Sequence, residues 1–198
     1  MQELNTQTTY FARPGPGNTD RTLELAYARA KSLGLRTALV ATTTGDTAVR
    51  AVRALQGIQV IAVTHSTGFG EPNVQELTSE SRSAIEAAGG RVLTCQHALG
   101  GVNRAVRKKL DTYQLDEIIA FTLRLFSQGI KVAAEISLMA ADAGLVRTDV
   151  PVLTIAGSGG GADTAAVMLP TNAQTFFDLK ILEIICRPSP EHPAFSAG

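Results

Sequence analysis

Short strand-like segments alternate with helical patterns through the first half of the chain, and this alternation limits the fold most strongly. Residues 36–42, 58–64 and 91–95 have the length and apolar content of strands. The segments between them repeat an apolar residue every three or four positions, which is typical of a helix. Strands separated by helices form parallel sheets through right-handed crossovers, with both faces covered. The pattern predicts a three-layer α/β sandwich with a mostly parallel sheet.

The second half begins with a long helical section and ends in strands. Residues 101–144 carry helical patterns with breaks near Asp111 and Gly129. The connection between the first two strands that follow is too short for a crossover helix, so we expect a C-terminal antiparallel hairpin. The six strands expected in all are too few for an eight-stranded barrel. The last three of these strands are expected at residues 151–156, 164–169 and 179–186.

Length and composition indicate one domain, because 198 residues with 44% hydrophobic residues can form a single large core. We expect an N-terminal arm and loop over residues 1–17, the α/β domain over 18–187 and a loose tail over 188–198. Lys and Arg total 18, as do Asp and Glu, so no positive excess favours nucleic acid. We further expect no membrane span, no metal site, a cytoplasmic location and a homo-oligomer.

The first candidate binding loop joins a predicted strand directly to a predicted helix. Ligands of open parallel sheets gather at the carboxyl ends of the strands. Hydroxyls and free N–H groups at this point, aided by the helix dipole, make a seat for a phosphate. A simple helix cap would need only one such residue, so the run of threonines favours a binding loop. The loop is not a Walker loop, because no Lys follows the glycine. The loop contains Thr42, Thr43, Thr44, Gly45, Asp46 and Thr47.

The second candidate loop is rich in glycine and follows the strand expected at residues 151–156. Four glycines in five positions let a backbone approach a ligand closely and turn its N–H groups inward. A hairpin turn would need only one or two glycines. Because no helix follows, the spacing is not a dinucleotide fingerprint. The predicted binding residues here are Gly157, Ser158, Gly159, Gly160, Gly161, Asp163 and Thr164.

The loop after the second strand offers further polar groups at the same edge. Thr64, His65 and Gly68 lie in it, and Phe69 could stack on a ring. Two glycines could let this segment move as a lid, although an ordinary surface loop fits the pattern equally well. His97, after the third strand, could bond a ligand oxygen or cap the next helix.

Glu135 lies on an apolar helix face, where a carboxylate is costly without a partner. One interpretation is a salt bridge to Lys131 or Arg104. The other, which we favour at this point, is a hydrogen bond to an N–H or hydroxyl group of a ligand. Glu135 therefore joins the candidate site.

Taken together, the two main loops resemble the C-terminal α/β domain of pyruvate kinase. There a strand runs into T-x-S-G-[RK]-[ST]-A, matched here by residues 42–48, and the likeness extends over residues 19–170. The chain is more similar still to the free-standing pyruvate kinase α/β-domain-like proteins of archaea and bacteria. These share the motifs G-D-T-A, E-I-x-x-M-A-A-D and G-A-D-T-A, which occur here at residues 45–48, 135–142 and 161–165.

The resemblance implies a pyruvate kinase C-terminal domain-like fold and a site for flavin mononucleotide (FMN), with the phosphate at Thr43–Thr47. Ser158 and Asp163 would line the opposite wall, while His65, Gly68 and Glu135 would reach the ring or the polyol. The pyruvate kinase loop has a basic residue where this chain has Asp46. A monophosphate with a polyol tail therefore fits better than a sugar bisphosphate.

Three functions stay open at this point. The first is the binding of a phosphorylated cofactor, FMN above all. The second is a non-catalytic phosphometabolite sensor derived from a pyruvate kinase regulatory domain. The third is a hydrolase or transferase that uses Cys95 or Glu135. We expect no pyruvate kinase activity, because the sequence has no counterpart of that enzyme's catalytic barrel, and whether any reaction is catalysed is left open.

Overall fold

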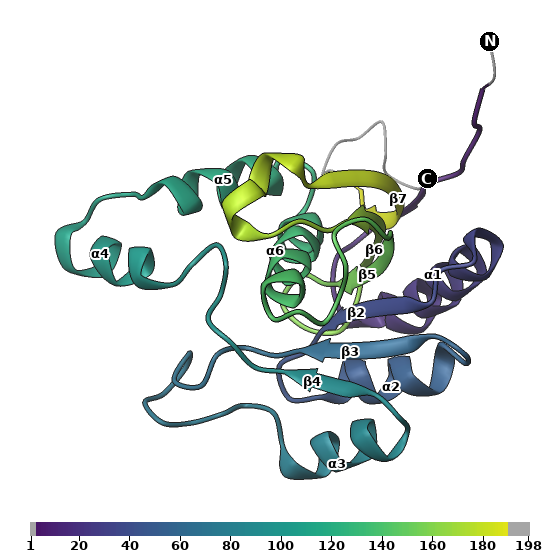
Figure 1. The fold of residues 1–198 in the computed structure, drawn as a ribbon, viewed down its shortest axis with the longest axis horizontal. Coiled ribbons are helices and arrows are strands. Elements are labelled where there is room, and N and C mark those ends of the chain that lie inside the picture. Colours follow the sequence, from purple (N-terminus) through teal and green to yellow (C-terminus); the bar gives the residue numbers. More distant parts are fainter. Residues whose placement is uncertain (1–2, 190–198) are drawn as a thin grey trace.

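A seven-stranded sheet forms the centre of the protein, in a computed structural model that describes residues 3–189 (Figure 1). The strand order is β1-β7-β6-β5-β2-β3-β4. The strands are β1 (Thr9–Phe11), β2 (Thr37–Ala41), β3 (Gln59–Val63), β4 (Arg91–Leu93), β5 (Val152–Ala156), β6 (Thr164–Leu169) and β7 (Lys180–Pro188). The helices are α1 (Thr19–Leu33), α2 (Asp46–Ala54), α3 (Ser79–Ala87), α4 (Val102–Leu110), α5 (Leu115–Arg124) and α6 (Gln128–Asp142), with 3-10 turns η1 (Pro16–Asn18) and η2 (Ala173–Asp178).

One strand, β6, runs against all the others. The pairs β1–β7, β2–β3, β2–β5 and β3–β4 are parallel, whereas β5–β6 and β6–β7 are antiparallel. The predicted α/β class, the mostly parallel sheet and the C-terminal antiparallel hairpin are therefore confirmed. The carboxyl ends of β2, β3, β4 and β5 all lie at one edge of the sheet, which is where the candidate loops begin.

The two faces of the sheet bury alternate residues of each strand, as the pleat requires. On β2, Ala38 and Val40 belong to the cluster formed with α1, α2 and α3, whereas Leu39 belongs to the cluster formed with α6. Figure 1 shows α1, α2 and α6 lying along the sheet, while α4 lies away from it at the left of the view. Because both faces are covered, the central strands β2, β5 and β6 are largely apolar and buried.

The prediction of six strands is wrong, because β1 is a seventh. It lies within residues 1–17, which the sequence pattern assigns to an arm, and forms the edge of the sheet by pairing in parallel with β7, with Thr9 opposite Cys186. Three residues are too few to show a period-two pattern. The expected tail over 188–198 falls outside the described residues from 190 onward.

The break expected near Gly129 lies just before it instead. The hydroxyl of Ser127 accepts a hydrogen bond from the N–H of Ile130 at 3.1 Å and so caps α6, which begins at Gln128.

Among residues 3–189, no helix is both long enough and apolar enough to span a bilayer. The same residues contain no cluster of three or more His, Cys, Asp or Glu side chains suited to a metal.

Candidate functional site

A cavity of about 740 Å³ lies at the carboxyl edge of the sheet and joins the two main loops. Its walls include Thr42, Thr43, Thr44, Asp46 and Thr47 from the first loop and Gly157 and Gly159–Gly161 from the second. Helix α6 supplies an apolar side of the cavity, formed by Val132, Ile136 and Met139. A cleft of this size, with an apolar side and polar groups that converge on it, is typical of a small-molecule site.

The amino terminus of α2 opens into this cavity without a side-chain cap. Its N-cap is Gly45, whose φ of 108° is accessible mainly to glycine. A Cβ atom at Gly45 would lie 2.2 Å from Cβ of Ser81, so α3 packs directly against the turn. The first N–H groups of a helix have no partner within the helix, and they carry its partial positive charge.

The threonine hydroxyls of the first loop are free to meet a ligand. Within the described part of the chain, no other residue bonds the hydroxyls of Thr42, Thr43, Thr44 or Thr47. The carboxylate of Asp46 lies 3.8 Å from the Arg50 guanidinium, one turn along α2. Arg50 contacts Asp20 more closely, at 2.5 Å, so it offsets the charge of Asp46 only in part.

The glycine loop is held in shape by Asp163 from beneath. Asp163 is fully buried, and its carboxylate accepts hydrogen bonds from the N–H groups of Gly15 at 2.9 Å and Ser158 at 3.1 Å and from the hydroxyl of Thr164 at 2.9 Å. Next to it, the N–H of Ala162 donates to the Thr19 hydroxyl at 2.9 Å. The side chain of Asp163 therefore positions the loop.

Glu135 is buried and has three partners, two from the segment after β4 and one from α6 itself. One carboxylate oxygen accepts a hydrogen bond from the N–H of Leu99 at 3.0 Å and lies 3.7 Å from Nδ1 of His97, and the other pairs with Lys131. Burial alone would raise the pKa of this carboxyl, but the facing His97 and Lys131 outweigh it and lower the pKa to about 2. The Lys131 salt bridge, the interpretation we did not favour from sequence, is present.

The loop between β3 and α3 closes one end of the cavity with aromatic rings. Its base is tied by a 2.7 Å contact between Nδ1 of His65 and Glu76. The Phe69 ring stacks on His97, with centroids 4.9 Å apart and planes 18° apart. The Arg104 guanidinium lies over Phe69 at 4.9 Å, so rings and a cation gather at this wall.

Two guanidinium groups at the cavity have no acidic partner. Arg104 contacts Phe69, and Arg124 donates to the side chain of Gln128 at 2.7 Å. Across residues 3–189, neither forms an ion pair with a carboxylate. Because Lys131 is balanced by Glu135, these two arginines leave the cavity with an excess of positive charge, although the whole chain has none.

Most of the predicted site residues line the cavity, including Thr64, His65 and Glu135. Asp163, expected in a wall, is buried beneath it, and Ser158 contributes its backbone to holding the loop. Gly45, Gly68 and Thr164 likewise lie outside the lining. The sequence analysis missed Arg124 and Gln128, which no local motif marks because the turn between α5 and α6 brings them to the cavity.

The cysteine chemistry considered from the sequence gains no support, because Cys95 does not line the cavity. Burial, and then the charge of Asp142, raise the pKa of the Cys95 thiol. A nucleophilic cysteine needs the opposite shift, because the thiolate is the reactive form. Glu135, with its pKa of about 2, stays ionised at neutral pH and cannot act there as a general acid.

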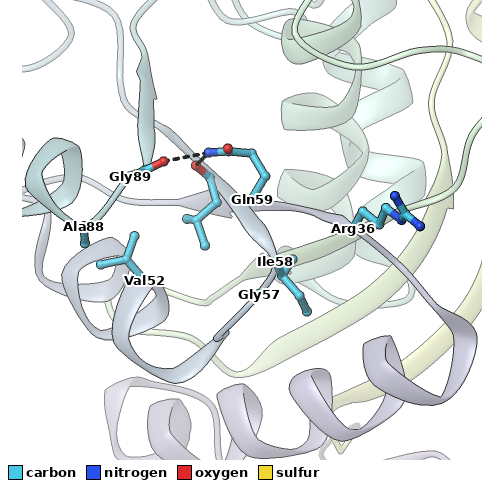
Figure 2. A pocket seen from close by; sticks show the side chains of 9 residues that line it. Arg36, Val52, Gly57, Ile58, Gln59, Ala88 and Gly89 are labelled. Atoms are coloured by element: carbon cyan, nitrogen blue, oxygen red, sulfur yellow. Dashed lines mark hydrogen bonds between the residues drawn. The ribbon is translucent and has the colours of Figure 1, made fainter.

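A second cavity, of about 520 Å³, opens at the amino ends of β2, β3 and β4 (Figure 2). Gln59 bridges part of it by donating to the carbonyl of Gly89 at 2.9 Å. No predicted site residue lines it. In open α/β sheets ligands bind beyond the carboxyl ends of the strands, so the first cavity is the candidate site.

Comparison with known families agrees with this arrangement. Residues 20–168 match the family model described as pyruvate kinase, alpha/beta domain. The chain belongs to the pyruvate kinase alpha/beta domain family. The matched region contains both main loops, the loop after β3 and helix α6, so the cavity is built almost entirely from this alpha/beta domain.

Solved structures with a similar chain path include two of pyruvate kinase from Cryptosporidium parvum. The first has 13% sequence identity and a TM-score of 0.38, and the match covers 74% of this chain and 22% of that chain. The second, in complex with ADP, also has 13% identity and a TM-score of 0.38, and the match covers 83% of this chain and 23% of that chain. An NH3-dependent NAD synthetase from Campylobacter jejuni, in complex with nitrate, has 16% identity and a TM-score of 0.37, and the match covers 72% of this chain and 56% of that chain. This chain thus covers less than a quarter of the length of these pyruvate kinase chains.

Proposed function

We propose that this protein binds a phosphorylated small molecule between the α2 loop and the glycine loop, and that the ligand is FMN. One observation carries the proposal: the uncapped amino terminus of α2 and its unbonded threonine hydroxyls face the same cavity as the glycine loop. Unsatisfied N–H groups at a helix amino terminus are a ready-made anion site. The excess positive charge from Arg104 and Arg124 supports the same ligand class.

The residues at the cavity suit the three parts of FMN. The phosphate would accept hydrogen bonds from the first N–H groups of α2 and from the hydroxyls of Thr43 and Thr47. The ribityl hydroxyls would meet Thr64 and the backbone of the glycine loop. The ring system would lie in the rest of the cavity, between the apolar side of α6, which includes Met139, and the wall that contains Phe69 and His97. When bound, a flavin supplies redox chemistry, and the protein supplies its binding and orientation.

A sensor of non-aromatic phosphorylated metabolites is the second candidate. The guanidinium groups of Arg104 and Arg124 favour it, because they can each form paired hydrogen bonds to a phosphate without any ring contact. Such a protein would bind a sugar phosphate more tightly than FMN. It would also need no side chain that acts as a general acid, a general base or a nucleophile.

The first experiment compares the purified protein with and without ligand. FMN binding predicts an absorbance band near about 450 nm after reconstitution. It also predicts a rise in melting temperature of roughly 5–10 °C at about 100 times the dissociation constant, given the size of the chain. The sensor predicts this rise with ribose 5-phosphate instead. No shift with saturating FMN contradicts the FMN proposal.

A further inference from the structure

Phe69 lies in the cavity wall without belonging to the hydrophobic core. It packs into none of the three buried clusters of the described residues, and it keeps 37% of its surface exposed. Its ring neighbours are His65, at a centroid distance of 4.1 Å, and His97, at 4.9 Å. The Arg104 guanidinium lies over the Phe69 ring, 4.9 Å from its centroid. An apolar ring thus rests on polar groups that themselves line the cavity.

The segment that carries Phe69 is anchored at its base and hinged at its tip. The His65–Glu76 contact and the N–H of Gly68 donating to the carbonyl of Val74 at 2.9 Å fix the base. Glycines stand on both sides of Phe69, and Gly68 has a φ of 81°. The N–H of Phe69 itself donates to the carbonyl of Ser66 at 3.2 Å, so the ring would leave by rotation of its side chain or through dihedral changes at Gly70.

Two of the groups that contact the Phe69 ring come from outside its loop. His97 follows β4, and its Nδ1 lies 3.7 Å from the buried Glu135, while its Nε2 accepts from the N–H of Ser66 at 3.4 Å. Arg104 lies on α4. We call the His97 ring and the Arg104 guanidinium the cation–ring shelf. A flat ring stacked on an imidazole and a guanidinium is the arrangement that recognises planar heteroaromatic ligands.

We propose that the cation–ring shelf is the subsite for the planar ring of the ligand, and that Phe69 occupies this subsite until a ring-bearing ligand replaces it. The inference rests on the proposed function and narrows its ligand class to phosphorylated compounds with a planar heteroaromatic ring. Phe69 is then a competitor of the ligand ring. Its removal strengthens binding, whereas removal of an ordinary wall residue weakens binding.

The decisive experiment measures the affinities of two probes that differ in the ring. FMN and ribitol 5-phosphate share the phosphate and polyol, so calorimetric titration of both isolates the contribution of the ring. Phe69→Ala is expected to tighten FMN binding about threefold to tenfold, since one stacking partner no longer competes. The affinity of the Phe69→Ala variant for ribitol 5-phosphate is expected to stay at the wild-type value. The control is Val74→Ala, a truncation in the same loop outside the cavity, which should change neither.

A reporter at the same position keeps the test independent of the truncation. The chain contains no Trp, so Phe69→Trp introduces a single tryptophan whose emission can be followed. FMN should shift its emission maximum to longer wavelength as the indole leaves the shelf, and ribitol 5-phosphate should not. Energy transfer to flavin changes the intensity, so the wavelength and acrylamide quenching are the readouts. An unmoved maximum with bound FMN overturns the proposal.

The outcomes separate the two proposals. Weaker or unchanged FMN binding by Phe69→Ala overturns the ring subsite alone, with the FMN proposal intact. Binding of ribitol 5-phosphate but not of FMN by either protein also overturns the ring subsite and leaves a phosphate site. Binding of neither probe by either protein overturns both. Binding of FMN by Phe69→Ala but not by the wild type supports the subsite.

Discussion

The carboxylate of Asp163 accepts a hydrogen bond at 2.9 Å from the N–H of Gly15, which lies 148 positions earlier in the chain. The same carboxylate bonds the N–H of Ser158 at the start of the glycine loop. One buried side chain therefore connects the N-terminal segment to the loop that borders the cavity. The shape of the glycine loop depends on this connection as well as on the glycines.

Replacement of Asp163 tests this connection. Asp163→Ala leaves the buried N–H of Gly15, the part-buried N–H of Ser158 and the Thr164 hydroxyl without their acceptor, so we expect the free energy of unfolding to fall by about 2–4 kcal/mol. Urea denaturation followed by circular dichroism measures the change. Asp149→Ala, at an exposed ion pair with Arg147, should change it by less than about 0.5 kcal/mol. Equal effects of the two variants would contradict the role of Asp163.

The turn before α2 offers a second test. Gly45→Ala forces a residue with a Cβ atom to adopt a φ of 108° and places that atom 2.2 Å from Cβ of Ser81. We expect a loss of more than about 2 kcal/mol in unfolding free energy, together with weaker anion binding. Gly34→Ala is the matched control, because its φ is 68° and nothing lies within 4 Å of the added atom. It should cost about 1 kcal/mol. Comparable thermal denaturation of both variants would refute the close approach of α3.

Glu135 makes stability depend on pH in a definite direction. Its pKa is lowered from 4.5 to about 2, so the native state favours the ionised form. The stabilisation is complete above the unfolded-state value and is lost as the pH falls from about 4.5 towards 2, and it amounts to on the order of 3 kcal/mol.

The variant Glu135→Gln isolates this effect. It should be less stable than the wild type at pH 7, because Lys131 loses its partner, and the difference should shrink as the pH falls to 2. Denaturant titrations at several pH values measure the difference. A gap that stays constant or widens on acidification would show that Glu135 is not ionised in the native state.

Local patterns were enough to predict much of this fold and part of the site. The strands β2, β3 and β5 and the hairpin follow from apolar runs and loop length, and the α2 loop and the glycine loop follow from residue type and topology. Strand β1 was not predictable, because its pairing with β7 joins residues more than 170 positions apart. The stack of Arg104 on Phe69 is equally non-local, since α4 reaches the cavity only through the path of the chain after β4.

The most direct test of the phosphate site compares FMN with riboflavin, which has the same ring and polyol but no phosphate. Isothermal titration calorimetry of the wild type should show FMN binding at least about tenfold more tightly. In the variant Thr47→Val, which removes a cavity hydroxyl without a change of shape, that ratio should fall, while Thr148→Val should leave it unchanged. Equal affinities of the wild type for FMN and riboflavin would contradict a phosphate seat at the amino terminus of α2.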